Sequence, residues 1–223
     1  MQKLCAFFGI QKGITALIGG GGKTSTMYAL AEELLTSGSV IVCTTTHILK
    51  PPQYPYLPVV TNRLNPGEAV STGISDGAKL TAPHQSFDEL RQLADYILVE
   101  ADGSRQLPLK AHATHEPVIP DGTETVLVLI GIDGLGRSIR EAAHRPELFA
   151  AIVNQNKDAI VTNEMIHSVV LTYPRFDGII INKADDASHI RNAESLAELF
   201  SVPVAITAWQ SERPIKGYRR NYS

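Results

Sequence analysis

The chain has 223 residues, of which 43% are hydrophobic and 19% charged, with a formal net charge of −3. This composition excludes an intrinsically disordered chain and a strongly basic surface, so no nucleic-acid partner is expected. No apolar run reaches bilayer length, so we expect one soluble domain with no membrane partner. Cys5 and Cys43 lack metal-site spacing and fit reduced thiols in the cytoplasm. The oligomeric state stays open.

A glycine-rich loop follows the first predicted strand. The apolar run 14–18 leads into four glycines, then Lys23-Thr24, and then a helix-favouring segment at 27–35. This order is typical of P-loop proteins, in which the loop backbone curls around phosphates, the lysine reaches the β- and γ-phosphates and the hydroxyl binds Mg²⁺. The residues predicted to bind a nucleoside triphosphate here are Gly19, Gly20, Gly21, Gly22, Lys23, Thr24 and Ser25.

The loop departs from the pattern G-x-x-x-x-G-K-[ST] because Leu17 stands at the first glycine. It most resembles the K-G-G-x-G-K-T loop of dimer-activated NTPases, but Ile18 replaces the signature lysine. This replacement argues against dimer-driven hydrolysis and leaves the group that would stabilise the transition-state charge unidentified. A plain glycine-rich turn is the alternative, which the Lys-Thr pair and the flanking periodicity disfavour.

Hydroxyl groups follow the second predicted strand, 39–43. The residues Thr44-Thr45-Thr46-His47 come where a parallel strand ends, which is where ligands gather in open α/β sheets. One threonine is a candidate contact of Mg²⁺ or the γ-phosphate, and β-branched residues that simply finish the strand are the equal alternative. The proline-rich stretch 49–84 then predicts a crossover insertion or a mobile flap in place of a separate domain, and it leaves room for short extended pieces such as 58–61.

A helix from Phe87 and a strand at 96–99 lead to Glu100-Ala101-Asp102-Gly103. We predict that Glu100 holds Mg²⁺ opposite Thr24, and that the N–H of Gly103 contacts the γ-phosphate. Asp102 is the alternative metal-side acid or orients an attacking water. The predicted catalytic residues are Lys23, Glu100 and Asp102. An acidic loop that caps the next segment is the alternative interpretation.

An irregular loop rich in cations and imidazoles is predicted at 104–122. Arg105 and Lys110 are candidates for binding an anionic substrate group or transition-state charge. A metal site is disfavoured because the pattern H-x-x-H has no third well-spaced ligand. The ligands of such a metal site would be His112, His115 and Glu116.

The strand predicted at 177–181 ends in N-K-x-D, after a strand at 125–130 and helices at 148–153 and 163–171. An Asp carboxylate accepts from both N1–H and the amine of guanine, whereas adenine has no proton on N1. Asp185 is therefore the predicted guanine contact. Asn182 is expected to brace the loop and touch the base edge, and the Lys183 stem is expected to cover the face of the base. A further helix and the strand 202–206 lead to Thr207-Ala208-Trp209, which resembles the S-A-K segment of guanine-binding proteins although Trp209 replaces the lysine. The resemblance implies that the N–H of Ala208 contacts guanine O6. A basic tail from 211 is expected to be flexible.

Strands that alternate with helices, and motifs in this order, predict a doubly wound, mainly parallel sheet of the P-loop NTPase type, with Mg²⁺ and GTP (or ATP) as ligands. As a set, the motifs resemble the YqeC family of selenium-dependent molybdenum hydroxylase accessory proteins. The segments that carry this resemblance are 14–24, 44–48, 99–104, 107–111, 115–120 and 144–147. The resemblance implies a cytoplasmic nucleotide-binding protein that serves the maturation of a molybdenum hydroxylase, with that enzyme or its cofactor-maturation proteins as partners.

Two classes of function remain open at this point. The first is a Mg²⁺-dependent NTPase, with GTP favoured over ATP. The second is a nucleotide-gated cofactor-insertion chaperone without significant hydrolysis, or a phosphotransferase that acts on a cofactor precursor near Arg105 and Lys110. Phosphate release from GTP, with and without candidate acceptors, would separate them.

Overall fold

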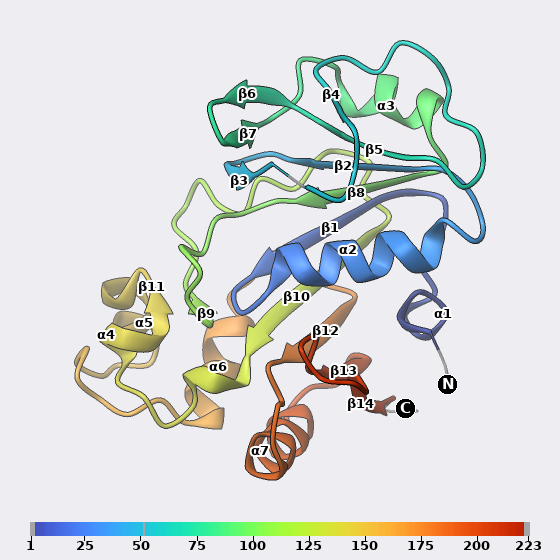
Figure 1. Ribbon diagram of the computed structural model, residues 1–223. Coiled ribbons are helices and arrows are strands. Elements are labelled where there is room, and N and C mark those ends of the chain that lie inside the picture. Colours follow the sequence, from blue (N-terminus) through green and yellow to red (C-terminus); the bar gives the residue numbers. More distant parts are fainter. Residues whose placement is uncertain (1–2, 51, 221–223) are drawn as a thin grey trace. The chain divides into compact units, whose positions relative to one another are not determined.

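A computed structural model describes residues 3–50 and 52–220, so residues 1–2, proline 51 of the predicted insertion and residues 221–223 of the predicted tail lie outside the described residues. The fold is α/β, with a large, mainly parallel sheet flanked by helices, as predicted (Figure 1). The chain divides into two compact units. The first unit comprises the residues up to Ile18, Thr24–Gly103 and Pro117–Val126; the second comprises Gly19–Lys23, Ser104–Glu116 and the residues from Leu127 onward. The prediction of a single domain stays a prediction.

The first unit is built on parallel strands. Their order is β1 (Gly13–Gly19), β8 (Tyr96–Glu100), β2 (Val40–Thr44), β5 (Ala69–Thr72) and β4 (Tyr56–Leu57). Every residue of β2 and β8 is buried, which suits continuous apolar runs in a sheet that is covered on both faces. The register places Glu100 beside Leu17 on one side and Thr44 on the other. The carboxyl end of the sheet therefore carries a carboxylate next to a hydroxyl.

The helices of the first unit are α1 (Leu4–Phe8), α2 (Lys23–Leu34) and α3 (Phe87–Leu93). In Figure 1, α2 runs alongside β1. It begins earlier than the apolar periodicity predicts because the glycine loop ends directly in its first turn. A capping box between Ser86 and Glu89 fixes the start of α3.

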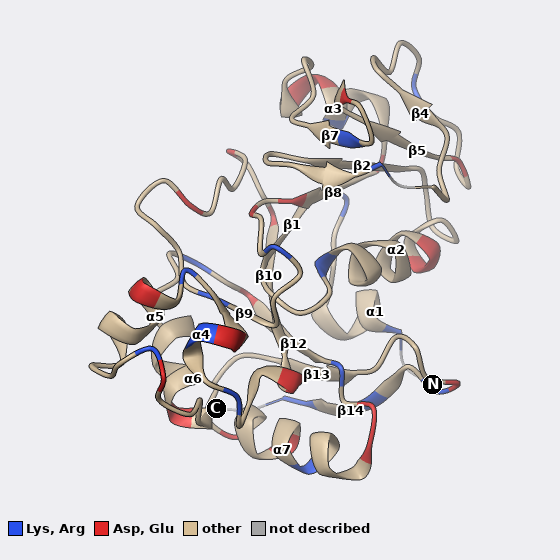
Figure 2. Cartoon of the chain, turned by 60° about the vertical axis from the view of Figure 1, so that its left-hand side comes forward, with Lys and Arg blue, Asp and Glu red and all other residues tan. Residues whose placement is uncertain are grey.

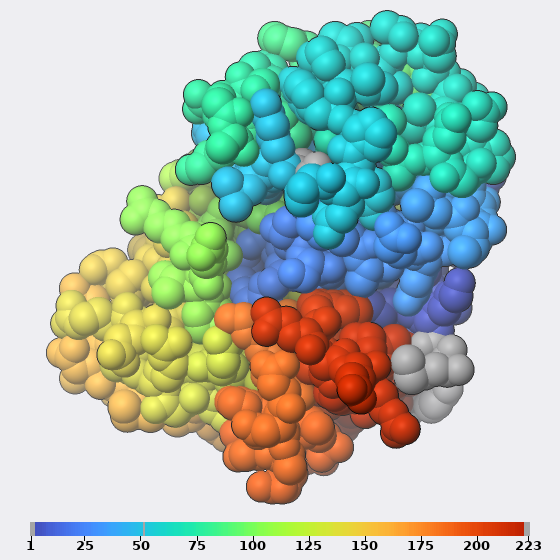
Figure 3. Space-filling model, viewed as in Figure 1, coloured from blue at the N-terminus to red at the C-terminus, as the bar shows by residue number. Residues whose placement is uncertain are grey.

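The insertion at 49–84 contains more regular structure than its prolines predict. It supplies β4 and β5, and it also completes an antiparallel sheet of β3 (Ile48–Leu49), β7 (Lys79–Thr81) and β6 (Ile74–Asp76). The extended piece expected at 58–61 is instead β4, at 56–57. Figure 3 shows the cyan and teal residues of this segment as one continuous surface.

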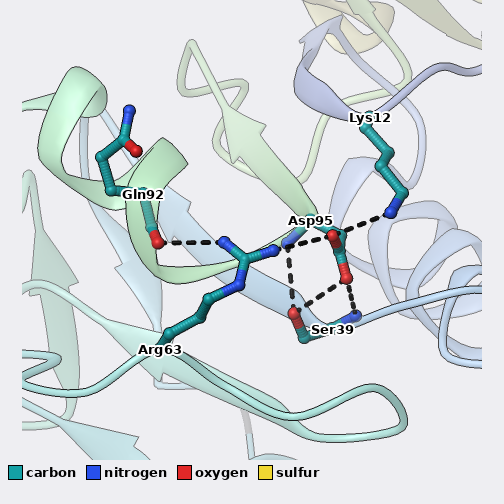
Figure 4. Close-up of polar contacts among 5 residues, drawn as sticks. All are labelled: Lys12, Ser39, Arg63, Gln92 and Asp95. Atoms are coloured by element: carbon teal, nitrogen blue, oxygen red, sulfur yellow. Dashed lines mark hydrogen bonds and ion pairs between the residues drawn. The ribbon is translucent and has the colours of Figure 1, made fainter.

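Asp95 joins the amino ends of neighbouring strands in the first unit (Figure 4). Its carboxylate accepts hydrogen bonds from the Ser39 N–H (3.1 Å), Lys12 (3.0 Å) and Arg63 (3.0 Å), and its backbone oxygen accepts from the Gly13 N–H (2.9 Å). The hydrogen bond from Lys12 and the one from the Ser39 backbone hold the pKa of Asp95 below its usual value of 3.8. The ionised carboxylate is therefore the form that the folded state stabilises.

Replacing Asp95 with alanine is expected to lower the free energy of unfolding by roughly 2 to 3 kcal/mol, because the buried Ser39 N–H loses its acceptor. The native pKa is lowered, so this stability is present above about pH 4 and is lost as pH falls through the native pKa. Urea denaturation of both proteins between about pH 3 and pH 7 measures it. The control Asp158→Ala removes an exposed ion pair with Arg140 and should cost less than about 1 kcal/mol. A difference between Asp95→Ala and wild type that stays constant over this whole pH range would contradict the electrostatic explanation.

The second unit has the strand order β14 (Ile215–Arg219), β13 (Val204–Thr207), β12 (Gly178–Asn182) and β10 (Thr125–Gly131), in which only β14 is antiparallel among these described strands. A short parallel pair, β9 (Leu109–Lys110) and β11 (Ala143–His144), lies apart from this sheet. Its helical segments are η1 (Ile132–Gly134), α4 (Ile139–Ala142), α5 (Pro146–Ile152), α6 (Asn163–Val170) and α7 (Ala187–Ala197).

The C-terminal tail corrects one expectation. Its basic composition predicts a flexible segment from 211, but residues 215–219 form β14 and pair with β13. The backbone hydrogen bonds of an edge strand order this segment even though it carries few apolar side chains. Among the helices of residues 3–50 and 52–220, none is both long enough and apolar enough to cross a membrane.

Candidate functional site

The four consecutive glycines are required by close packing within the second unit. Gly21 has φ +83°, and a side chain there would collide with the backbone of Gly131, where β10 ends. Gly22 has φ +117°, and a side chain there would meet the amide of Asn182, where β12 ends. Only glycine adopts such angles readily and allows this approach. The loop is therefore moulded against the carboxyl ends of two strands.

Hydrogen bonds hold the loop in place. The N–H of Gly20 donates to Leu129 (3.0 Å) and that of Gly21 to Leu107 (3.1 Å), so two N–H groups that the sequence assigns to phosphates are used within the protein. The Nζ of Lys23 donates to the carbonyl of Gly19 at 2.6 Å, and the residue is only 3% exposed. In the first turn of α2, the N–H groups of Thr24 and Ser25 have no acceptor inside the helix.

The predicted metal-side pair meets within the first unit. Thr24 Oγ1 donates to Glu100 Oε2 at 2.9 Å, and Glu100 is 8% exposed. Thr44 Oγ1 donates to the backbone oxygen of Glu100 at 2.7 Å and accepts from the Thr46 N–H at 2.9 Å. Of the hydroxyls expected at this strand end, the buried Thr44 thus fixes Glu100 and the following turn.

Tyr28 is a site residue that the sequence analysis misses. It lies one helical turn after Thr24 on α2, so both side chains share one face of the helix. Burial and then the charge of Glu100 raise the pKa of Tyr28 to about 12. The phenol therefore stays protonated near the carboxylate at neutral pH. The i, i+4 spacing from Thr24 is the signal that could have identified it.

Asp102 and Gly103 follow Glu100 at the same strand end. Asp102 is completely buried, and the adjacent Ala101 N–H donates to Leu17 at 2.9 Å, so this segment is tied to β1. A side chain at Gly103 would meet no atom within 4 Å, so packing does not explain the glycine. The roles predicted for both residues stay predictions.

The N-K-x-D segment is connected to the glycine loop within the second unit. Asn182 Nδ2 donates to the carbonyl of Gly21 at 2.8 Å and so ties this segment to the glycine loop, while its predicted contact with the base stays a prediction. Thr207, which the sequence analysis does not single out, donates to Asn182 Oδ1 at 3.0 Å. Lys183 has φ +64° and pairs with Asp133 at 2.8 Å, while Asp185 is exposed.

Ala208 does not present the donor that the sequence predicts. Its N–H already donates to the carbonyl of Pro214 at 2.7 Å. This bond belongs to the turn that leads into β14, and the predicted contact with guanine O6 would require it to break. Because the sequence predicts a flexible tail from 211, it does not indicate that the carbonyl of Pro214 accepts this hydrogen bond.

Lys110 is also placed differently from its prediction as an anion contact. Its side chain is 0% exposed, and its Nζ lies 3.1 Å from a carboxylate oxygen of Glu116. Buried cations are normally paired in this way. Arg105 stays exposed. Across residues 3–50 and 52–220, no three His, Cys, Asp or Glu side chains form a group that could hold a metal ion.

Comparisons with known proteins agree with the motifs. A sequence profile of the family described as YqeC protein matches residues 15–147, more than half of the chain. The uncharacterized protein YqeC of Escherichia coli (strain K12) is 37% identical over 162 residues, which cover 66% of this chain and 62% of that protein. The match thus spans less than two thirds of the relative's length. No solved structure matches.

Proposed function

This chain belongs to the YqeC protein family, and from that membership and the geometry above we propose that it binds a nucleoside triphosphate together with Mg²⁺. GTP is the favoured nucleotide over ATP. The proposed cellular role is that of a cytoplasmic accessory protein in the maturation of a selenium-dependent molybdenum hydroxylase. Its partners would be that enzyme or the proteins that mature its cofactor.

The observation that carries the proposal is the pair formed by Thr24 and Glu100, whose oxygens lie 2.9 Å apart. A hydroxyl in the first turn after a glycine loop and a carboxylate at a strand end are the protein oxygens that bind or orient Mg²⁺ in P-loop proteins. Mg²⁺ accepts few protein ligands and keeps several waters, so two such oxygens are enough. A Mg²⁺ ion bound to these oxygens would replace the hydrogen bond between them.

The glycine loop supports the phosphate part of the proposal. Lys23 is the residue that would bind phosphate, and its buried ammonium rests on the carbonyl of Gly19. A phosphate oxygen is a charged acceptor for this ammonium, and the lysine would turn from the carbonyl to the ligand on binding. Its position inside the loop would keep the rearrangement local.

The preference for guanine rests on Asp185. Asn182 ties the segment to the loop through Gly21, which would set the base at a constant distance from the phosphates. The exposed carboxylate of Asp185 lies three residues further on and can accept two hydrogen bonds from guanine. Adenine offers one donor and one acceptor there, so it would leave one oxygen facing a lone pair.

A titration of GTP against Mg²⁺ tests the proposal. Glu100→Gln keeps an acceptor for Thr24 but removes the charge, and it is expected to weaken Mg²⁺-dependent binding or turnover about tenfold or more. Asp102→Asn is the matched control, since it also neutralises a buried carboxylate next to the same strand end, and its effect should be smaller. If Asp102→Asn is the more damaging change, the metal-side acid is misassigned. Binding of GTP that is equally tight with Mg²⁺ and with EDTA would contradict the proposal.

A further inference from the structure

In the second unit, Arg145 is hydrogen-bonded through its Nε, while its two terminal nitrogens are available to a ligand. Arg145 Nε donates to Glu116 Oε2 at 2.9 Å, and the side chain is 31% exposed. Within residues 3–50 and 52–220, no hydrogen bond occupies its two terminal nitrogens. A guanidinium fixed at Nε presents two parallel donors, the arrangement that binds a carboxylate or phosphate in a bidentate manner.

The carboxylate that fixes Arg145 also receives a buried lysine. Glu116 lies 3.1 Å from the Nζ of Lys110, whose side chain is fully buried. Burial raises the pKa of Glu116, but the hydrogen bond from Arg145 and the charge of Lys110 outweigh it and hold the pKa at about 2. Glu116 is thus shared between two cations, and it engages Arg145 at Nε.

A second arginine adds to this charge. Arg105 is exposed and makes no hydrogen bond or ion pair with any residue that the structure describes. It stands in a tight turn in which φ is +49° at Arg105 and +63° at Gln106, closed by a hydrogen bond from Leu107 N–H to Ser104 (2.9 Å). Residues other than Gly, Asn and Asp rarely adopt these angles. Figure 2 marks the basic residues near β9 in blue.

The pKa of His144 responds to the charged side chains around Arg145. It pairs with Lys110 across β11 and β9, directly before Arg145 in the chain. Burial lowers its pKa, the charges of Lys110, Arg145 and Arg105 lower it further, and Glu116 alone acts in the opposite direction. Its Nδ1 is buried without a hydrogen-bond partner among the described residues. Buried polar atoms normally have a hydrogen-bond partner, so this atom can accommodate one from outside the described residues.

We propose that Arg145 and Arg105, supported by the Lys110–Glu116 pair, form a binding site for the oxyanion group of a small second ligand, a phosphate or a carboxylate. Arg145 supplies the bidentate contact, and the exposed Arg105 adds electrostatic attraction from a distance. All of these residues belong to one unit, and none is among the residues proposed to bind nucleotide. The oxyanion site can therefore be tested independently of nucleotide binding.

The test follows the imidazole signal of His144 by NMR, assigned with His144→Gln, while inorganic phosphate or succinate is added at constant pH and ionic strength. A bound anion favours the imidazolium, so the pKa of His144 is expected to rise in a saturable manner. Arg145→Gln should weaken the response about tenfold or more. Arg105→Gln should weaken it measurably but less, because an exposed charge acts through solvent. Arg140→Gln, which removes an exposed arginine paired with Asp158, should leave it unchanged. Of phosphate and succinate, the anion that saturates the His144 response at the lower concentration indicates which oxyanion group the site prefers.

Two further arms locate the response and check the fold. Repeating the phosphate titration with Lys23→Ala separates this site from the glycine loop, and the His144 response should persist. Thermal melting checks the fold of Arg145→Gln, while Arg105→Gln breaks no bond and tests the site even if Arg145→Gln unfolds. A response that is equal in wild type and Arg105→Gln, or that disappears only with Lys23→Ala, overturns the proposal.

Discussion

Lys23→Ala is expected to weaken triphosphate binding by about 30-fold or more while the chain stays folded. The ammonium is the charged donor of the glycine loop, and losing a charge-assisted contact with phosphate is worth roughly 2 to 3 kcal/mol, or about 30- to 150-fold in affinity. Because Lys23 is 3% exposed, its methylene stem also fills space in the loop. Lys23→Met, which keeps the stem and removes the charge, should lose affinity to the same extent.

Equilibrium titration with GTP and Mg²⁺ measures this effect, and circular dichroism checks the fold. The control is Lys157→Ala, which removes a partly exposed lysine paired with Glu147 and should leave nucleotide affinity unchanged. A folded Lys23→Met protein with wild-type affinity would show that the glycine loop is a structural turn. That result would leave the oxyanion site at Arg145 untouched, because the two sites share no residue.

Asp185→Asn is expected to change the preferred base from guanine to xanthine. The amide places an N–H₂ group opposite the guanine amine, so two donors face each other and GTP affinity should fall by tens- to several-hundred-fold, on the order of 2 to 4 kcal/mol. Xanthine keeps N1–H but carries a carbonyl in place of the amine, so the same amide donates to it. Affinity for XTP should therefore rise.

The measurement compares GTP, XTP and ATP against wild type and variant at one Mg²⁺ concentration. Asp121→Asn, at an exposed position, is the control for loss of one surface charge. A wild-type preference for ATP, or a variant that keeps full GTP affinity and gains none for XTP, would show that the N-K-x-D segment does not read guanine. The bracing bond from Asn182 to Gly21 would then have a purely structural role.

Features that depend on short stretches of chain follow from the amino-acid sequence alone. An apolar run followed by four glycines and Lys-Thr is enough to predict a strand, a tight loop and a helix, because β-branched residues, glycine angles and helix starts are local properties. The pairing of Thr24 with Glu100 was predictable for a related reason. Carboxyl ends of adjacent parallel strands meet at one edge, so the loop and first helical turn that follow β1 come close to Glu100, which ends β8.

Which charged and polar groups are available to a ligand depends instead on the packing of distant segments. The sequence predicts that Lys110 is available to an anion, yet its side chain is buried and paired with Glu116. Arg145, further along the chain, is the cation that stays partly exposed. In the same way, the N–H of Ala208 is taken by a turn into β14 that no local pattern announces. Burial and pairing are set by the segments that meet in the fold, and the free energy of a buried charge depends on its partner there far more than on its neighbours in sequence.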